Sequence, residues 1–204
     1  MNHLPNPTVK TLLGKLFLIP NLLTLLRILL IFPALYLLSE KLWWEAGITI
    51  MILFLTDFFD GYTARRFQQI SDFGSIFDPI ADKIVVLSFF GYFWNLDFVP
   101  VWYFIFLYLR NISQLLAIPV LLLWKRIPFQ VKPKLIPKWG TTLQFILLGF
   151  YCFQLIFQSI NGDFPWAWAE FPILFASFII EIYILITFVP RFIEIYLGKH
   201  DTFE

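Results

Sequence analysis

Cysteine, histidine and charged residues are all scarce in this chain of 204 residues. Its one cysteine, Cys152, cannot form a disulfide within the chain or supply a cluster of thiolates to a metal. The two histidines, His3 and His200, stand near opposite termini, which argues against a zinc site or a histidine-based catalytic pair. The formal net charge of +1 argues against nucleic acid as a partner.

Apolar residues, in contrast, make up 59% of the chain, and charged residues make up only 14%. Soluble domains are roughly 45–50% apolar and about 25% charged. Long apolar segments recur, and a helix needs about 20 such residues to cross a bilayer. The sequence therefore predicts an all-α integral membrane protein with six transmembrane helices. These are expected at about residues 21–38, 43–66, 78–94, 99–124, 140–159 and 171–189.

The first apolar segment is not followed by a signal-peptide cleavage pattern, so we expect it to remain in the mature protein. Before it, residues 1–19 mix lysines with leucines and phenylalanine, a composition typical of an amphipathic segment that lies on the membrane surface. We expect a single domain over residues 1–204. It would consist of an interfacial segment at 1–19 and a six-helix bundle at 20–197.

Basic residues are distributed unevenly among the predicted loops. Most stand at the two termini and in the loops after the second and fourth spans, whereas the opposite loops hold only Lys41 among several acids. By the positive-inside rule, the basic side is cytoplasmic, so both termini should lie in the cytoplasm. An interfacial aromatic belt is expected at the other side, formed by Trp43, Trp44, Trp94, Trp102, Trp166 and Trp168.

Four aspartates interrupt the second and third predicted spans near their cytoplasmic ends: Asp57, Asp60, Asp78 and Asp82. In a helix, residues three or four apart share one face, so each helix would present its two acids together. Two such helices facing each other would gather four carboxylates, which repel one another unless positive charge compensates them. Because oxygen ligands favour hard cations, the pattern predicts a site for two divalent ions, Mg²⁺ or Mn²⁺.

Small residues and an arginine accompany these acids. Gly61 and Gly74 leave room for a ligand beside the helix backbone, and Ala64 is also small. Arg65 offers a planar guanidinium that suits a diphosphate. Two hard cations beside a phosphate-binding group support an in-line displacement at phosphorus.

Together these residues form the pattern DxxDGxxAR, eight intervening residues, then GxxxDxxxD. The pattern resembles the signature of the CDP-alcohol phosphatidyltransferases at all eight defining positions. The resemblance implies a six-span, homodimeric fold in a bacterial-type inner membrane, in contact with membrane lipids. It also implies the transfer of a phosphatidyl group from CDP-diacylglycerol to an alcohol, with release of CMP. Because the acids lie at the cytoplasmic ends of their spans, we expect the active site on the cytoplasmic side.

The resemblance also implies roles for the individual residues of the pattern. The metal ligands would be Asp57, Asp60, Asp78 and Asp82. The residues that line the CDP-diacylglycerol site would be Gly61, Ala64, Arg65 and Gly74. Asp82 would in addition be the catalytic base that deprotonates the acceptor hydroxyl.

Two acceptor alcohols agree with the remaining motifs. The segments PNLLTLLR (residues 20–27) and DPIADK (residues 78–83) are similar to phosphatidylglycerophosphate synthases, which use glycerol 3-phosphate, and to CMP-forming cardiolipin synthases, which use phosphatidylglycerol. Glycerol 3-phosphate is a dianion that needs fixed cations. The candidates for these cations are Arg110, Lys132, Lys134 and Lys138. We expect glycerol 3-phosphate as the acceptor, with phosphatidylglycerol as the alternative.

Several polar residues inside the predicted spans admit two roles. Arg27 would either contact a substrate phosphate or extend to the lipid headgroups, and Asn21 and Thr24 would either approach the nucleotide or cap the first span. Glu181 lies in the middle of the sixth span, where we expect it to pair within the bundle or a dimer. A divalent-cation transporter is the alternative functional class. It is disfavoured because the acids cluster at one membrane face and Arg65 stands among them.

Overall fold

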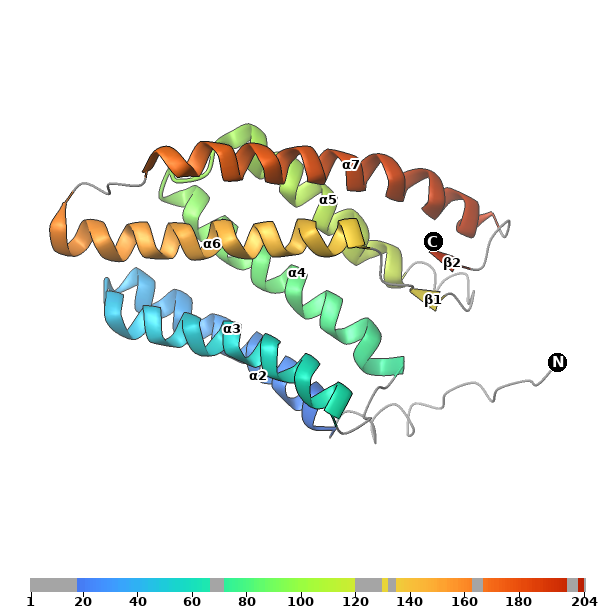
Figure 1. Cartoon of the computed structure of the whole chain (residues 1–204), viewed down its shortest axis with the longest axis horizontal. Coiled ribbons are helices and arrows are strands. Elements are labelled where there is room, and N and C mark those ends of the chain that lie inside the picture. Colours follow the sequence, from blue (N-terminus) through green and yellow to red (C-terminus); the bar gives the residue numbers. More distant parts are fainter. Residues whose placement is uncertain are drawn as a thin grey trace. The chain divides into compact units, whose positions relative to one another are not determined.

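Long helices dominate the computed structural model, which describes residues 18–66, 72–119, 130–131, 135–162, 167–197 and 202–203. Six α-helices of 19 to 27 residues lie in these ranges (Figure 1). They are α2 (Ile19–Ser39), α3 (Trp43–Arg66), α4 (Asp72–Asn95), α5 (Val101–Pro119), α6 (Leu135–Asn161) and α7 (Glu170–Tyr196). The other elements are the 3₁₀ turn η2 (Ala167–Ala169) and the short parallel strands β1 (Gln130–Val131) and β2 (Thr202–Phe203). Each of the six predicted apolar segments thus corresponds to one helix.

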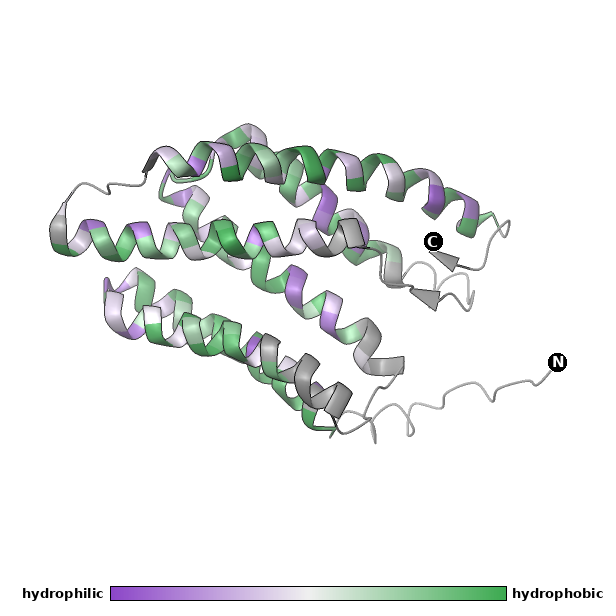
Figure 2. Ribbon diagram, in the orientation of Figure 1, coloured by the Kyte–Doolittle hydropathy of each residue, from purple (hydrophilic) through white to green (hydrophobic). Residues whose placement is uncertain are grey.

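Within the described residues, three helices are long and apolar enough to cross a membrane. These stretches are Asn21–Ser39, Trp139–Ile160 and Glu170–Tyr196, and a shorter apolar stretch covers Trp43–Thr56. Figure 2 shows apolar residues over most of α7. This agrees with the predicted helical membrane protein, whereas the full set of six spans stays a prediction. Most of the predicted interfacial segment, residues 1–17, lies outside the described residues.

Four of the six helices, α2, α4, α6 and α7, extend beyond the apolar segments that predicted them. Helix α4 begins at Asp72 rather than near Asp78, and α6 begins at Leu135 rather than at Gly140. The apolar pattern marks only the part of a helix that suits the membrane interior, and polar residues continue a helix readily on either side. Pro137 falls in the first turn of α6, where a proline is tolerated because its missing N–H would have no partner within the helix.

Two compact units make up the chain, Met1–Val85 and Val86–Glu204. In the first unit, α2 and α3 lie side by side as an antiparallel pair, joined by a tight turn at residues 40–42 (Figure 1). Ala34 and Ala46 are completely buried, and such small residues allow helix backbones to approach closely. The larger buried residues of this pair are Ile31, Leu38, Ile50 and Leu53.

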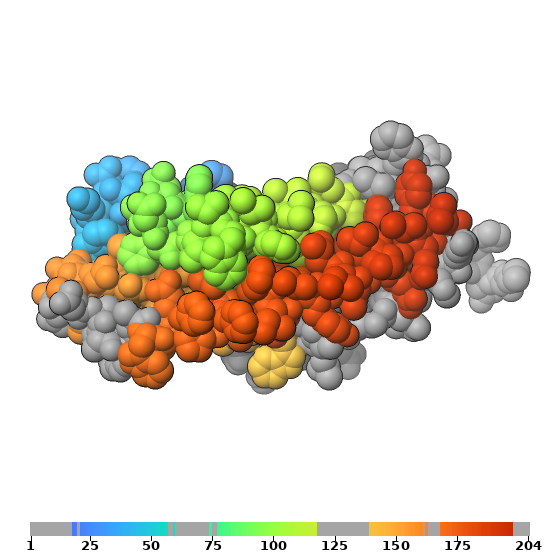
Figure 3. Space-filling model, turned by 90° about the horizontal axis from the view of Figure 1, so that it is seen from above, coloured from blue at the N-terminus to red at the C-terminus, as the bar shows by residue number. Residues whose placement is uncertain are grey.

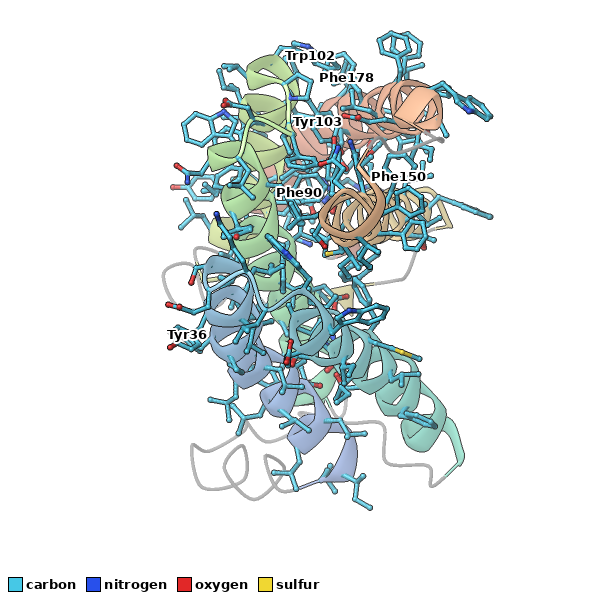
Figure 4. All side chains as sticks on the ribbon, turned by 90° about the vertical axis from the view of Figure 1, so that its left-hand side faces the viewer. Tyr36, Phe90, Trp102, Tyr103, Phe150 and Phe178 are labelled. Atoms are coloured by element: carbon cyan, nitrogen blue, oxygen red, sulfur yellow. The ribbon has the colours of Figure 1, made fainter. Side chains whose placement is uncertain are left out.

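In the second unit, both α5 and α6 pack against α7. Figure 3 shows α5 and α7 side by side on one face. An aromatic cluster fills the interior of this unit, where the ring of Phe90 lies 5.9 Å from Tyr103 and 6.3 Å from Tyr151. Trp102 and Phe178 meet between α5 and α7, with their ring centroids 4.8 Å apart (Figure 4). These contacts set which faces of α4, α5, α6 and α7 point inward.

Large apolar side chains also cover outward faces of the helices. Phe32 and Tyr36 on α2 are 72% and 63% exposed, and Tyr36 points away from its helix in Figure 4. Ile186 on α7 is similarly exposed. Apolar side chains on the outside are expected where lipid tails, rather than water, surround a helix.

Candidate active site

The eight motif residues lie on two helices, as predicted. Helix α3 carries the first five, and their side chains lie outside the described residues: Asp57, Asp60, Gly61, Ala64 and Arg65. Helix α4 carries Gly74, Asp78 and Asp82, all of which the structure describes. The geometry of the site can therefore be built from its α4 half.

Both α4 aspartates are held by side chains of α2. The Thr24 hydroxyl donates a hydrogen bond to Asp78 Oδ1 at 2.7 Å. The Arg27 guanidinium donates from Nη1 to Asp82 Oδ1 at 2.5 Å, which is also an ion pair. Because the two contacts advance in the same direction along both helices, α2 and the first part of α4 run parallel here.

The two α2 residues are more deeply buried than Asp82. Thr24 and Arg27 are completely buried, whereas the side chain of Asp82 is 24% exposed. Arg27 therefore does not extend to the lipid headgroups, which was one of its two expected roles. The arginine instead neutralises a carboxylate, because burying either charge alone would be costly.

Capping of the first span is also excluded for Asn21 and Thr24. Helix α2 begins at Ile19, and its N-cap is Leu18, which makes no side-chain capping hydrogen bond. Pro20 stands in that first turn, where its fixed φ favours the helix. Asn21 and Thr24 consequently lie inside the helix, and both are buried.

The antiparallel pairing of α2 and α3 indicates where the backbone of the other two aspartates, Asp57 and Asp60, lies. The second half of α3 carries positions 57 and 60, and it lies at the same end of this helix pair as the first half of α2. That half of α2 contacts Asp78 and Asp82. The backbone positions of the four predicted ligands thus share one end of the first unit. Their arrangement as a common cage stays a prediction.

The described acids fit a hard divalent cation by their chemistry. Both are carboxylates, and each carboxylate has two oxygens that together accept about four bonds. A carboxylate can therefore accept a hydrogen bond from Thr24 or Arg27 and ligate a cation as well. No cluster of three or more potential ligands occurs among the described side chains, which exclude those of Asp57 and Asp60.

A second group of buried polar side chains lies among the helices of the second unit. Arg110 Nε on α5 is 3.1 Å from Glu181 Oε2 on α7, and Gln144 on α6 donates to Glu181 Oε1 at 2.5 Å. Arg110 also donates from Nη1 to Asn111 Oδ1 at 2.8 Å. The Arg110 Nε–H is not directed at the Glu181 oxygen, so this contact is an ion pair without a hydrogen bond. Pairing of Glu181 within the bundle is thereby confirmed.

The start of α6 lies close to this group. A side chain at Gly140 would have its Cβ 2.7 Å from Ile184 Cδ1 and 3.8 Å from Arg110 Nη2. Lys138 precedes Gly140 by two positions on the same helix, and its side chain, like all of Lys132 and Lys134, lies outside the described residues. The structure thus brings Arg110 close to the first turns of α6, the helix that carries Lys138.

Two features of these groups were missed from the sequence. Gln144 was not singled out, although an amide inside an apolar span signals a polar partner on another helix. The pairing of Thr24 with Asp78 was also missed. Its signal was the three-residue spacing of Thr24 and Arg27, which puts both on one face of α2.

The chain is similar to a known protein family over most of its length. The family model for CDP-alcohol phosphatidyltransferase matches residues 17–189. Similar proteins include the CDP-diacylglycerol--glycerol-3-phosphate 3-phosphatidyltransferases of Rickettsia typhi, with 44% identity over 72 residues, and of Escherichia coli K12, with 42% identity over 73 residues. The matches cover 33% and 34% of this chain, and 40% of each relative.

The matched stretch is therefore less than half of each relative's length. No solved structure matches the chain. The family model, however, covers most of the sequence and includes the whole stretch from Asp57 to Asp82. On this evidence, the chain belongs to the CDP-alcohol phosphatidyltransferase family.

Proposed function

We propose that this protein transfers a phosphatidyl group from CDP-diacylglycerol to glycerol 3-phosphate, giving phosphatidylglycerophosphate and CMP. The observation that carries the proposal is the complete eight-residue motif within the family match at residues 17–189. The relatives named for this reaction favour glycerol 3-phosphate over phosphatidylglycerol as the acceptor.

The reaction is a displacement at phosphorus. The acceptor hydroxyl attacks the phosphorus that bears diacylglycerol, a new P–O bond forms, and the bond to CMP breaks with its electrons leaving on CMP. Asp82 accepts the proton of the hydroxyl, for which its partly exposed carboxylate is suited. Two Mg²⁺ or Mn²⁺ ions held by Asp57, Asp60, Asp78 and Asp82 would, when bound, polarise the diphosphate and stabilise the leaving group.

The remaining motif residues bind the CDP-lipid in this proposal. Arg65 pairs with the diphosphate through its planar guanidinium. Gly61, Ala64 and Gly74 provide space for the nucleotide beside the helices. Gly74 lies on α4 one turn before Asp78, which puts its backbone close to a predicted metal ligand.

The phosphate of the acceptor is assigned to Arg110, Lys132, Lys134 and Lys138. Glu181 already compensates the charge of Arg110, so the lysines would supply the net positive charge that a dianion requires. Arg110 would then orient the phosphate of the acceptor, and it would add no net positive charge. Its position beside Gly140, at the start of α6, supports this division.

In the membrane, we propose six spans in one domain over residues 1–204, with residues 1–19 on the membrane surface and the bundle at 20–197. Both termini and the active site face the cytoplasm of a bacterial-type inner membrane, and the protein forms a homodimer. The six long helices and the bacterial origin of the relatives support this arrangement.

To test this, the purified protein is incubated with Mg²⁺ and with labelled CDP-diacylglycerol. Glycerol 3-phosphate, phosphatidylglycerol, inositol phosphate and serine are each added as the acceptor in parallel reactions. The expected result is CMP release with formation of phosphatidylglycerophosphate, both abolished by EDTA. Cardiolipin as the product would assign phosphatidylglycerol as the acceptor instead. Divalent-ion flux in proteoliposomes without CMP release would show that the protein is a transporter and not this enzyme.

A further inference from the structure

Helix α2 contacts both aspartates that α4 contributes to the motif, although α2 itself lies outside the motif. We propose that Thr24 and Arg27, here called the α2 clamp, are positioning residues for the metal site. The clamp orients Asp78 and Asp82 for the divalent cations, and Arg27 compensates the charge of Asp82 while no cation is bound. This inference rests on the metal site of the proposed function.

The geometry of the clamp sets the orientation of α4. Thr24 and Arg27 are three residues apart on α2, and Asp78 and Asp82 are four apart on α4, so each pair lies on one face of its helix. Because α2 and this part of α4 run parallel, Thr24 can bond to Asp78 while Arg27 bonds to Asp82. Two contacts one turn apart on the same face of α4 hold that face toward α2 more firmly than a single contact would.

The hydroxyl of Thr24 donates its hydrogen bond to another helix, unlike the hydroxyls of Thr49 and Thr56 in the same unit. The hydroxyl of Thr49 bonds to Glu45 O at 2.8 Å, and that of Thr56 bonds to Leu53 O at 2.6 Å, each within its own helix. A hydroxyl has one hydrogen to donate, and Thr24 donates it to a carboxylate 54 residues away on another helix. Because Thr24 is completely buried, the donor side of this bond is shielded from competing water, whereas its acceptor Asp78 is partly exposed.

Arg27 provides positive charge where the sequence places several acids. Its guanidinium is completely buried, and a charge in such surroundings is costly unless it has a partner. Asp82 is that partner at 2.5 Å, and the contact equally stabilises the carboxylate. Removing Arg27 would take away one of the positive charges that offset the repulsion among the acids, so a bound cation would have to offset more of it.

The clamp has a measurable consequence for cation binding. Groups that hydrogen-bond a metal-binding side chain orient it, and their removal typically costs roughly 10- to 100-fold in metal affinity. Binding is measured with Mn²⁺ alone, by electron paramagnetic resonance of the free ion, on the purified full chain in lipid nanodiscs without CDP-lipid. We expect Thr24→Val to weaken Mn²⁺ binding by this factor.

Two variants control for the loss of a hydroxyl in a helix. Thr24→Ser keeps the donor and is expected to retain most of the Mn²⁺ affinity. Thr49→Val makes the same chemical change where the hydroxyl bonds within its own helix, and its Mn²⁺ affinity should equal that of the parent protein. Parent-like Mn²⁺ affinity in Thr24→Val would overturn the role of Thr24.

The role of Arg27 is tested through thermal unfolding with EDTA and with Mn²⁺. In EDTA, Arg27→Gln should unfold at a clearly lower temperature than the parent protein, and Mn²⁺ should restore most of the difference. Arg27→Lys keeps the charge and should be affected less. An equal loss with EDTA and with Mn²⁺ would mean that Arg27 only packs, which would overturn its role as a compensating charge.

The same measurements separate this inference from the proposed function. If the parent protein binds no Mn²⁺, the proposed metal site fails and the clamp fails with it. If the parent protein binds Mn²⁺ and the Thr24 and Arg27 variants behave like it, the clamp alone is wrong and the metal site stands.

Discussion

Buried polar side chains that pair across helices decide how residues are oriented in both units. In the first unit, Thr24 and Arg27 hold Asp78 and Asp82. In the second, Glu181 forms an ion pair with Arg110 on α5 and accepts a hydrogen bond from Gln144 on α6. Polar groups are expensive in apolar surroundings, and pairing removes much of that cost. Each pair therefore favours one rotation of its helices over others.

Asp82 is the residue whose chemistry the proposed reaction needs most directly. We expect Asp82→Asn to abolish CMP release and to leave CDP-lipid binding largely intact, because the amide keeps the shape but accepts no proton. Turnover and equilibrium binding of labelled CDP-diacylglycerol are measured on the same preparation. The matched control is Asp97→Asn, at an exposed position with φ of 61°, which asparagine tolerates. Normal turnover in Asp82→Asn would refute its role as the base.

The Arg110–Glu181 pair predicts a non-additive effect on stability. Arg110→Met leaves Glu181 buried without its cation, so we expect a loss of about 3–5 kcal/mol in the free energy of unfolding. The double variant with Glu181→Leu should recover most of this loss, since no charge then remains buried. Unfolding is followed in mixed detergent micelles.

A partly exposed ion pair on α7 provides the comparison. Arg191 Nη1 lies 3.4 Å from Glu194 Oε2 one turn away, and solvent reaches both side chains. Arg191→Met should cost at most about 1 kcal/mol. Equal losses for Arg110→Met and Arg191→Met would contradict the importance assigned to the buried pair.

At the scale of the helices, small residues determine how closely two of them approach. Ala34 and Ala46 are completely buried in the α2–α3 pair, and Gly140 plays the same role between α6 and α7. A Cβ at Gly140 would lie 2.7 Å from Ile184 Cδ1 and 3.2 Å from Ile180 Cγ2, closer than packed carbons normally approach. The spacing of α6 and α7 therefore depends on the absence of a side chain there.

Two glycines of α6 allow this dependence to be measured. Gly149→Ala meets no atom within 4 Å of its new Cβ, so it should gain up to about 1 kcal/mol of helix propensity. Gly140→Ala makes the same change but displaces Ile184, so we expect it to be less stable than Gly149→Ala by about 1 kcal/mol or more. Thermal unfolding of both variants measures the difference. Equal stability would show that α6 and α7 tolerate a wider spacing.

For the whole molecule, the distribution of charge predicts the arrangement in the membrane. Basic residues gather near the termini, at Arg65 and Arg66 and between residues 125 and 138, whereas the turn between α2 and α3 is expected on the opposite side. An odd number of spans between two positions separates them across the bilayer. Positions 40 and 199 should therefore face opposite compartments.

Labelling of single cysteines tests this topology. Cys152 is buried and gives a low background. Glu40→Cys should react with a membrane-impermeant maleimide on intact spheroplasts, and Lys199→Cys should react only in inside-out vesicles. A permeant maleimide that labels both positions serves as the control for access. Labelling of both from the same side would contradict the six-span arrangement.

The sequence by itself determined the helices and the motif that they carry. Runs of apolar residues mark a helix wherever they are long enough, because that signal depends only on neighbouring residues. The spacing of the acids, from Asp57 to Asp82, likewise indicated a family and its chemistry before any fold was known. The ends of α4 and α6 were misplaced, because helices continue past the apolar pattern.

Only the tertiary structure decided which polar residues meet. Arg27 and Asp82 are 55 residues apart in the chain, and nothing in the periodicity of either helix specifies that they face each other. The role of Arg27, the partner of Glu181 and the contact of Gly140 with α7 all depend on helix packing. The physical reason is that local pattern sets the apolar side of a helix, whereas rotation and neighbours are selected by pairing buried charges across the bundle.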